Sequence, residues 1–79
     1  MDEKLFIKNF AEQFEDRDPS TIAISTKFRE LDDWSSLVAL SVMAMCFEEY
    51  SVILSADEME HAEQISDICD IVKSRCQNE

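Results

Sequence analysis

The sequence predicts an all-α domain: a four-helix bundle of three longer helices and one short helix, with a long first loop. The chain has 79 residues with no glycine and one proline, whereas a sheet with tight hairpins normally needs glycine-bearing turns. The apolar fraction of 46% suffices for a core. This length fits one domain over residues 1–79. A chain this short buries only about 60% of its unfolded surface, so a large enclosed active site is not expected.

The chain is strongly acidic. It carries 18 Asp and Glu against 7 Lys and Arg, which gives a net charge of −11 at pH 7. Nucleic acids and anionic membrane surfaces both require clustered Lys and Arg, so we expect neither as a partner. A protein with a basic surface is the natural complement, although acidic residues also keep a small protein soluble.

The three cysteines, Cys46, Cys69 and Cys76, are too few and too irregularly spaced for a disulfide framework or a zinc site. We expect the first two in the core and the third as an exposed thiol. Met1-Asp2-Glu3-Lys4 is acidic and no apolar signal-peptide region follows it. No stretch reaches the roughly 20 apolar residues of a membrane span. We therefore expect a cytoplasmic monomer with no membrane insertion.

A first helix is predicted from Glu3 to about Glu15, because Phe6, Phe10 and Phe14 step by four residues and share one face. Asp18-Pro19-Ser20 is expected to close it, since proline disfavours the helical conformation of the preceding residue. Ser20 to Asp33 then shows weak periodicity, and we expect a long ordered loop with a short turn around Thr26–Glu30. Its apolar anchors are Ile22, Ile24, Phe28 and Leu31.

The longest apolar run predicts a central helix from Ser36 to about Tyr50. Its buried stripe is expected along positions three and four apart, broadened by two neighbours: Leu40, Met43, Phe47, Tyr50, Val42 and Cys46. The stripe does not accommodate Leu37, Val38, Ala44 and Met45 as well in so small a domain. Either the helix is buried almost all round, or part of its apolar surface is a docking site.

Two more helices are predicted after the central one. Ser55-Ala56-Asp57-Glu58 is a capping box, with serine at the cap and glutamate three residues later, and predicts a short helix over about Ala56–Ala62. A closing helix is expected near Ile65, with apolar residues at helical spacing: Ile65, Ile68, Cys69 and Val72. Its first residue is left open, because Gln64 is a poor cap and Ser66 would shift the start.

The central helix is preceded by Asp32-Asp33-Trp34 and two serines. Serine before an apolar-periodic segment is an N-cap signal, and Ser35 and Ser36 can each fill that position. A hydroxyl there lies in the positive field of the helix end, beside unpaired amides. These features would favour a phosphate ester. A plain cap, worth about 1 kcal/mol and without other function, is the simpler interpretation.

Several segments then stand in a distinctive order. They are Phe28-Arg29-Glu30-Leu31, Ser36-Leu37, an apolar helix ending in Glu48-Glu49-Tyr50, Val52-Ile53-Leu54, an acid-rich short helix and a closing Ile/Val helix. In this order and spacing the chain resembles the acyl carrier protein family, from about Leu5 to Val72. The specificity comes from order and spacing together rather than from one motif.

The resemblance implies that Ser36 carries a covalent 4′-phosphopantetheine arm, transferred from coenzyme A. The thiol of the arm would carry acyl intermediates as thioesters in fatty-acid, polyketide-like or related biosynthesis. The protein would be a non-catalytic carrier rather than an enzyme. Its partners would be a phosphopantetheinyl transferase and acyl-transfer or synthase enzymes with basic or apolar docking patches.

The chain departs from the family pattern around the serine. Ser35 replaces the aspartate that usually precedes the modified serine, one extra residue follows Leu31, and the nearest acids are Asp33 and Asp32. Val38, Ser41 and Phe47 stand where the family carries acids, so we expect a more apolar docking surface. The expected partner-binding residues are Asp33, Trp34, Leu37, Val38, Met45, Glu48, Glu49, Asp57 and Glu58.

The alternative function is an unmodified acidic interaction module that docks a protein partner through the central helix. An independent enzyme is disfavoured, because the sequence shows no nucleophile–base pair and no metal cluster. His61 has no neighbouring nucleophile. Glu48 and Glu49 are adjacent, so they point about 100° apart on a helix and do not suit paired carboxylate chemistry.

Overall fold

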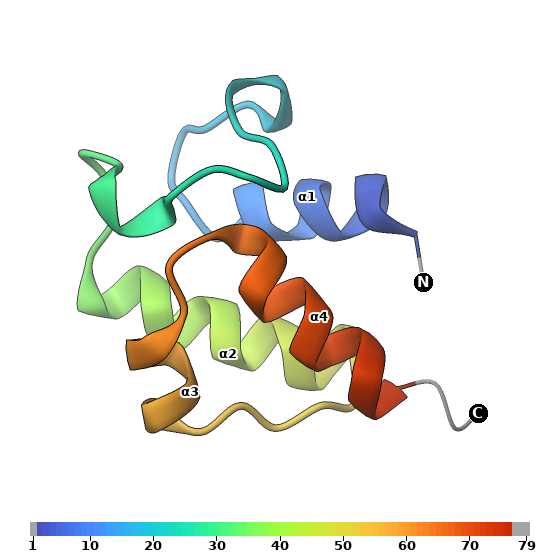
Figure 1. Cartoon of the computed structure of the whole chain (residues 1–79). Coiled ribbons are helices and arrows are strands. Elements are labelled where there is room, and N and C mark those ends of the chain that lie inside the picture. Colours follow the sequence, from blue (N-terminus) through green and yellow to red (C-terminus); the bar gives the residue numbers. More distant parts are fainter. Residues whose placement is uncertain (1, 77–79) are drawn as a thin grey trace.

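The computed structural model describes residues 2–76, which form helices and loops without a β-strand. The four α-helices are α1 (Glu3–Ala11), α2 (Ser36–Tyr50), α3 (Ala56–His61) and α4 (Ile65–Cys76), and two short 3-10 helices, η1 (Pro19–Thr21) and η2 (Phe28–Glu30), lie in the first loop. Figure 1 shows α4 crossing in front of α2, α1 above them and α3 near the start of α2. The predicted all-α domain with one short helix and a long first loop is confirmed.

α1 ends earlier than predicted, at Ala11 instead of Glu15. Beyond Ala11 the backbone changes to tighter hydrogen bonds, with the Phe14 amide donating to the Ala11 carbonyl at 3.1 Å. The residues that follow include Glu12, Glu15 and Asp16, and negative charge is unfavourable at a helix C-terminus. The prediction that Asp18-Pro19-Ser20 closes this helix is also wrong, because Pro19 instead begins η1.

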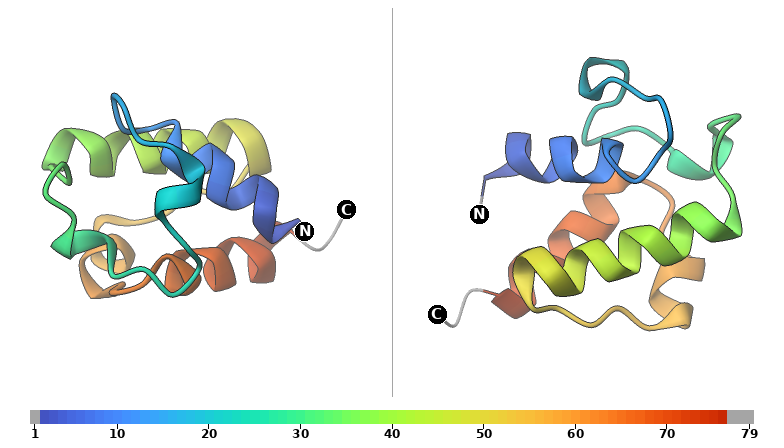
Figure 2. Two further views of the ribbon diagram at one scale, coloured as in Figure 1. Left: turned by 90° about the horizontal axis from the view of Figure 1, so that it is seen from above. Right: turned by 180° about the vertical axis from the view of Figure 1, so that it is seen from behind.

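The long first loop is ordered by contacts with the core and with α4. Ile22 and Phe28 are buried, and the predicted short turn is confirmed as η2. The amides of Ile65 and Ser66 donate to carbonyls of this loop, at Thr26 (3.0 Å) and Ile24 (2.8 Å). The figure from above shows the loop passing over the start of α4 (Figure 2). The first turn of α4 is therefore satisfied by a segment distant in sequence.

A side chain within α4 also stabilises the start of this helix, whose first residue the sequence did not determine. The Asp67 carboxylate accepts hydrogen bonds from the amides of Gln64 and Glu63, both at 2.9 Å. These backbone donors lower the pKa of Asp67, because they stabilise the ionised form. α4 therefore begins at Ile65, and an acid inside its first turn binds the amides of the two residues that precede the helix.

An aromatic cluster centred on Phe10 joins α1 to the rest of the domain. Phe10 is fully buried, and its ring centroid lies 5.9–6.3 Å from four other rings: Phe6, Phe14, Phe28 and Trp34. Phe6 in turn lies 5.8 Å from Tyr50 at the end of α2. Offset and tilted ring pairs at these separations add to the stabilisation from area burial alone.

The predicted buried stripe of α2 is partly wrong. Leu40 and Phe47 are 62% and 56% exposed, whereas Val42, Met45 and Cys46 are buried. The helix is apolar on nearly every side, so periodicity alone could not identify the inner face. Burial raises the pKa of the Cys46 thiol to about 12. The predicted core positions of Cys46 and Cys69 are confirmed, and Cys76 is half-buried.

The end of α2 uses an unusual backbone conformation for its residue type. Ser51 follows the helix with φ 59° and ψ 33°, in the left-handed region, which glycine adopts at much lower cost. We expect Ser51→Gly to raise the free energy of unfolding by about 0.5–1 kcal/mol, since relief of strain exceeds the added entropy of the unfolded chain. Urea unfolding would measure it, with Ser25→Gly as a control in the first loop. Equal or opposite shifts in the two variants would contradict the prediction.

Candidate functional site

The two serines at the start of α2 have different roles. Ser35 has an extended backbone and is the N-cap, because its Oγ accepts a hydrogen bond from the Val38 amide at 3.2 Å. Ser36 is the first helical residue, its side chain is exposed, and its hydroxyl makes no hydrogen bond recorded within residues 2–76. The sequence allowed either serine to be the N-cap, and the structure shows that it is Ser35. The Ser36 hydroxyl is not used for capping.

The two residues before the serines are fixed to the first loop and the core. Arg17 donates to both carboxylate oxygens of Asp33, at 3.1 Å from Nε and 2.5 Å from Nη2. This bond to Arg17 lowers the pKa of Asp33. Trp34 stacks on Phe10 with 6.3 Å between centroids and 8° between planes. These contacts fix the backbone segment that precedes α2. The Asp33 carboxylate is already paired within the chain.

A groove of about 650 Å³ lies between the first turns of α2 and α3. Ser36 lines it, next to the apolar side chains of Ala39, Leu40, Met43, Ala56 and Met59. Arg29, Trp34, Ser35 and Glu60 complete the lining. The exposed hydroxyl therefore stands beside an open and largely apolar groove. Sequence reasoning did not predict this groove, because it depends on how α3 packs on α2.

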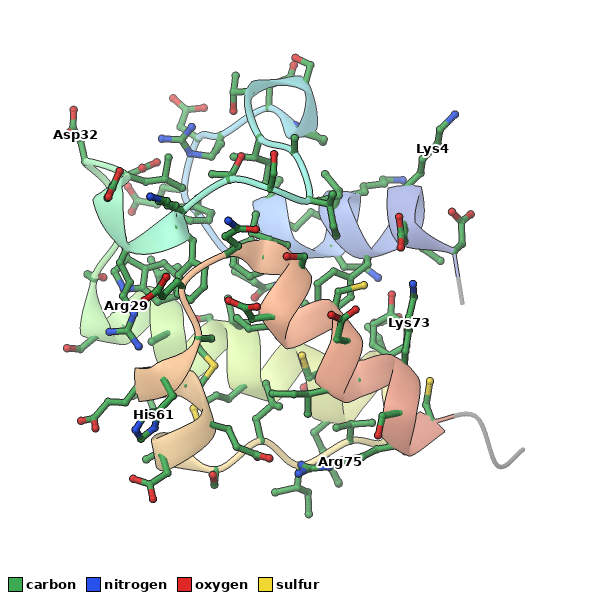
Figure 3. The ribbon with its side chains drawn as sticks, viewed as in Figure 1. Lys4, Arg29, Asp32, His61, Lys73 and Arg75 are labelled. Atoms are coloured by element: carbon green, nitrogen blue, oxygen red, sulfur yellow. The ribbon has the colours of Figure 1, made fainter. Side chains whose placement is uncertain are left out.

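α3, which forms one wall of this groove, is held at its C-terminal end by Arg29. The Arg29 side chain donates from Nε to the Ala62 carbonyl at 3.0 Å, and from Nη2 to the Met59 carbonyl. Figure 3 shows Arg29 reaching from the η2 segment toward α3. Carbonyls at a helix C-terminus lack intrahelical donors, so the guanidinium satisfies them.

The N-terminal end of α3 is held by the predicted capping box and by α4. Ser55 Oγ accepts from the Glu58 amide at 3.1 Å, and the Glu58 carboxylate accepts from the Ser55 amide at 2.9 Å. Arg75 donates to the same carboxylate and to the Ile53 carbonyl. The bond to Arg75 is the largest cause that lowers the pKa of Glu58. The Glu58 carboxylate, which was predicted to bind a partner, is therefore engaged in hydrogen bonds within the fold.

A second groove, of about 400 Å³, lies on the other side of the α2 start. Leu37, Val38 and Ser41 line it from α2. Gln13, Glu15, Asp16, Asp33 and Ser35 line it from the segments before α2. Ser35 lines both grooves, whereas Ser36 lines only the largely apolar one between α2 and α3.

The remaining sites predicted for partner binding differ in accessibility. Leu37 is 73% exposed, and Glu48, Glu49 and Asp57 are exposed, whereas Val38 is half-buried. Met45 is 4% exposed and packs in the core, so it offers a partner no surface in this structure. Leu40 and Phe47 were missed as surface residues. Their signal was in the sequence, because 37, 40, 44 and 47 also repeat at three and four residues.

Residues 2–76 contain no group of three or more His, Cys, Asp or Glu placed to hold a metal ion. His61 is exposed, with Nδ1 lying 2.8 Å from the Asp57 carbonyl. None of the helices described has the length and apolar character needed to cross a bilayer. We take Ser36 and the two grooves beside the start of α2 as the candidate site.

Known proteins give no direct guide to this site. No family model, no curated protein and no solved structure matches the chain significantly. The resemblance to acyl carrier proteins therefore rests on the order of motifs in the sequence.

Proposed function

We propose that the protein is an acyl carrier whose Ser36 bears a 4′-phosphopantetheine arm. The arm supplies a thiol that carries acyl intermediates as thioesters in fatty-acid, polyketide-like or related biosynthesis. The protein acts as a cytoplasmic monomer without catalysis of its own, and serves a phosphopantetheinyl transferase and acyl-transfer or synthase enzymes. The observation that carries the proposal is that Ser35 caps α2, so that the Ser36 hydroxyl is exposed and not used as the cap.

The surroundings of Ser36 fit a phosphodiester. It is the first residue of a 15-residue helix, whose N-terminal field and free amides favour an anion. Asp33 is the acid nearest to Ser36 in the sequence, and its negative charge is offset by an ion pair with Arg17. The groove beside Ser36 offers apolar side chains from Leu40, Met43 and Met59 to the arm or its cargo.

Acyl transfer would take place on the partner enzymes, and the chain's own residues supply position. Trp34 and Asp33 hold the segment before α2, and Arg29 holds the wall formed by α3. The modified side chain would thus project from a fixed helix end while its arm moves between the groove and an enzyme.

The second candidate function is an unmodified interaction module that docks a protein through α2. The observation in its favour is the exposure of large apolar residues along that helix, Leu37, Leu40 and Phe47. This surface does not require Ser36. The two candidate functions therefore differ in whether the serine is modified.

The two serines should respond oppositely to alanine substitution. Incubation with coenzyme A and a broad-specificity phosphopantetheinyl transferase should add one arm to the wild-type chain and to Ser35→Ala, but none to Ser36→Ala. Ser35→Ala should lose about 1 kcal/mol of stability, because it removes the cap, whereas Ser36→Ala should change stability by less than about 0.5 kcal/mol. Intact mass and urea unfolding would measure both effects.

An adduct that is lost in Ser35→Ala and retained in Ser36→Ala would place the arm on Ser35 and contradict the proposal. No adduct on any folded variant, with a carrier domain modified in the same reaction as a positive control, would favour the interaction module.

A further inference from the structure

Arg29 differs from the other two arginines of the chain in what its guanidinium pairs with. Arg17 and Arg75 form ion pairs with carboxylates, those of Asp33 and Glu58. The Arg29 guanidinium instead donates to two backbone carbonyls of α3, and it makes no ion pair within the described part of the chain. A carbonyl has no net charge, so the positive charge of Arg29 is not neutralised by an anion.

One edge of the Arg29 guanidinium is open. A guanidinium has five N–H donors in a fixed plane, and the bonds to α3 come from Nε and Nη2, which form one side of that plane. Nη1 donates to none of the residues that the structure describes. Nη1 and the second N–H of Nη2 form the other donor edge, and such an edge matches two oxygens of a phosphate group.

The guanidinium is also held in position by the fold. The carbonyls of Met59 and Ala62 fix one edge, and Cζ of Arg29 lies 5.7 Å from the ring centroid of Phe28, which is fully buried. The side-chain view shows Arg29 extended from η2 toward α3 (Figure 3). A donor that is already held in place loses little side-chain entropy when it binds an anion.

Arg29 and Ser36 line the same groove between α2 and α3. Among the described residues that line it, Arg29 is the only Lys or Arg, and Glu60 is the only acid. The other lining residues are apolar apart from Ser35 and Ser36. An anion attached to the Ser36 hydroxyl would therefore share its groove with one cationic side chain.

We propose that Arg29 binds the phosphodiester of the arm on Ser36, through Nη1 and the second N–H of Nη2. The other edge of the guanidinium keeps its bonds to the carbonyls of α3. This inference deepens the proposed carrier function and rests on it, because the phosphodiester exists only when Ser36 is modified. Arg29 thereby connects the base of the arm to the groove wall that α3 forms.

Paired unfolding experiments would measure this contact. Coenzyme A and a broad-specificity phosphopantetheinyl transferase would convert the wild type, Arg29→Met and Lys27→Met to their modified forms, and intact mass would verify each conversion. Urea unfolding of every modified and unmodified pair gives the factor by which the arm changes the folding equilibrium constant. Because each variant is compared with itself, the stability that Arg29→Met loses without the arm cancels.

The arm should favour folding about three- to fivefold more in the wild type than in Arg29→Met, as expected for a well-oriented ion pair near the surface. This difference should decrease as salt is raised. Lys27→Met removes the same charge from an exposed residue that does not line the groove, and should keep the wild-type factor.

NMR of the wild type tests the contact without any substitution. The Nε–H resonance of Arg29 should shift when the arm is attached. Those of Arg17 and Arg75, which are paired with Asp33 and Glu58, should stay in place. This measurement does not depend on whether Arg29→Met is stable enough to study.

Two kinds of failure are distinguishable. Equal factors in the wild type and Arg29→Met, equal losses in Arg29→Met and Lys27→Met, or an unchanged Arg29 resonance in the modified protein would overturn the role of Arg29 and leave the carrier function standing. A wild-type chain that takes up no arm, beside a carrier domain modified in the same reaction, would overturn both. Intact mass separates the two cases.

Discussion

Replacing Phe10 with alanine is expected to destabilise the domain by about 3–5 kcal/mol. Phe10 is fully buried, and its ring lies close to four other aromatic rings, from α1, the loop that follows α1, η2 and the segment before α2. The substitution removes the hydrophobic transfer energy of the ring and leaves a cavity that rigid neighbours cannot fill. A domain of this size has a total stability of roughly 4–12 kcal/mol, so the substitution should remove about a quarter of it or more.

Phe47→Ala is the matched control for this prediction, because it deletes the same side chain from an exposed position. Thermal and urea unfolding, followed by circular dichroism at 222 nm, would compare the two variants. Trp34 stacks on Phe10, so its fluorescence should also shift in Phe10→Ala well below the unfolding midpoint. Equal destabilisation of Phe10→Ala and Phe47→Ala would show that the aromatic cluster is not the centre of the core.

The second large effect is expected from Arg29→Met, which should lower stability by about 2 kcal/mol. Methionine keeps much of the apolar stem but donates no hydrogen bond to the carbonyls of Met59 and Ala62. Hydrogen bonds from a charged donor contribute roughly 1.5–3 kcal/mol, and unpaired carbonyls at a part-buried helix end add a desolvation cost. The loss should concentrate in α3, because that short helix has little intrinsic stability.

Amide hydrogen exchange would locate this effect. In Arg29→Met the α3 amides should exchange at least about tenfold faster, while the amides of α2 change only as far as global stability changes. Lys27→Met removes an exposed positive charge two residues away and should leave α3 exchange as in the wild type. If both variants accelerated α3 exchange equally, net charge rather than the Arg29 contacts would be the cause.

Local sequence signals were sufficient for the elements of the fold. α2 was predicted with its observed bounds, because an apolar run of this length without Gly or Pro suits a helix better than a strand. The capping box at Ser55 predicted α3, and its two reciprocal hydrogen bonds are present. These features depend on residues within four positions of one another, so a single sequence contains them.

Features that depend on distant residues could not be predicted in the same way. Arg17 with Asp33, Arg29 with Ala62 and Arg75 with Glu58 are 16, 33 and 17 residues apart. Nothing in the local pattern of an arginine specifies which carboxylate or carbonyl it will meet. The groove beside Ser36 depends on one of these contacts, so it too was beyond sequence reasoning.

The inner face of α2 was misjudged for a different reason. Two apolar stripes with three- and four-residue spacing share this helix, and Leu40 and Phe47 belong to both. Only packing against α1 and α4 selects which side is buried. The choice placed Met45 in the core and exposed Leu40 and Phe47, which turned part of an expected core stripe into protein surface.

The most direct test of the central claim is the intact mass of the protein isolated from the cells that naturally make it. The account predicts a species heavier than the bare chain by one 4′-phosphopantetheine, free or acylated, with fragmentation placing the arm on Ser36. A chain of unmodified mass, or an arm on any other residue, would contradict the account.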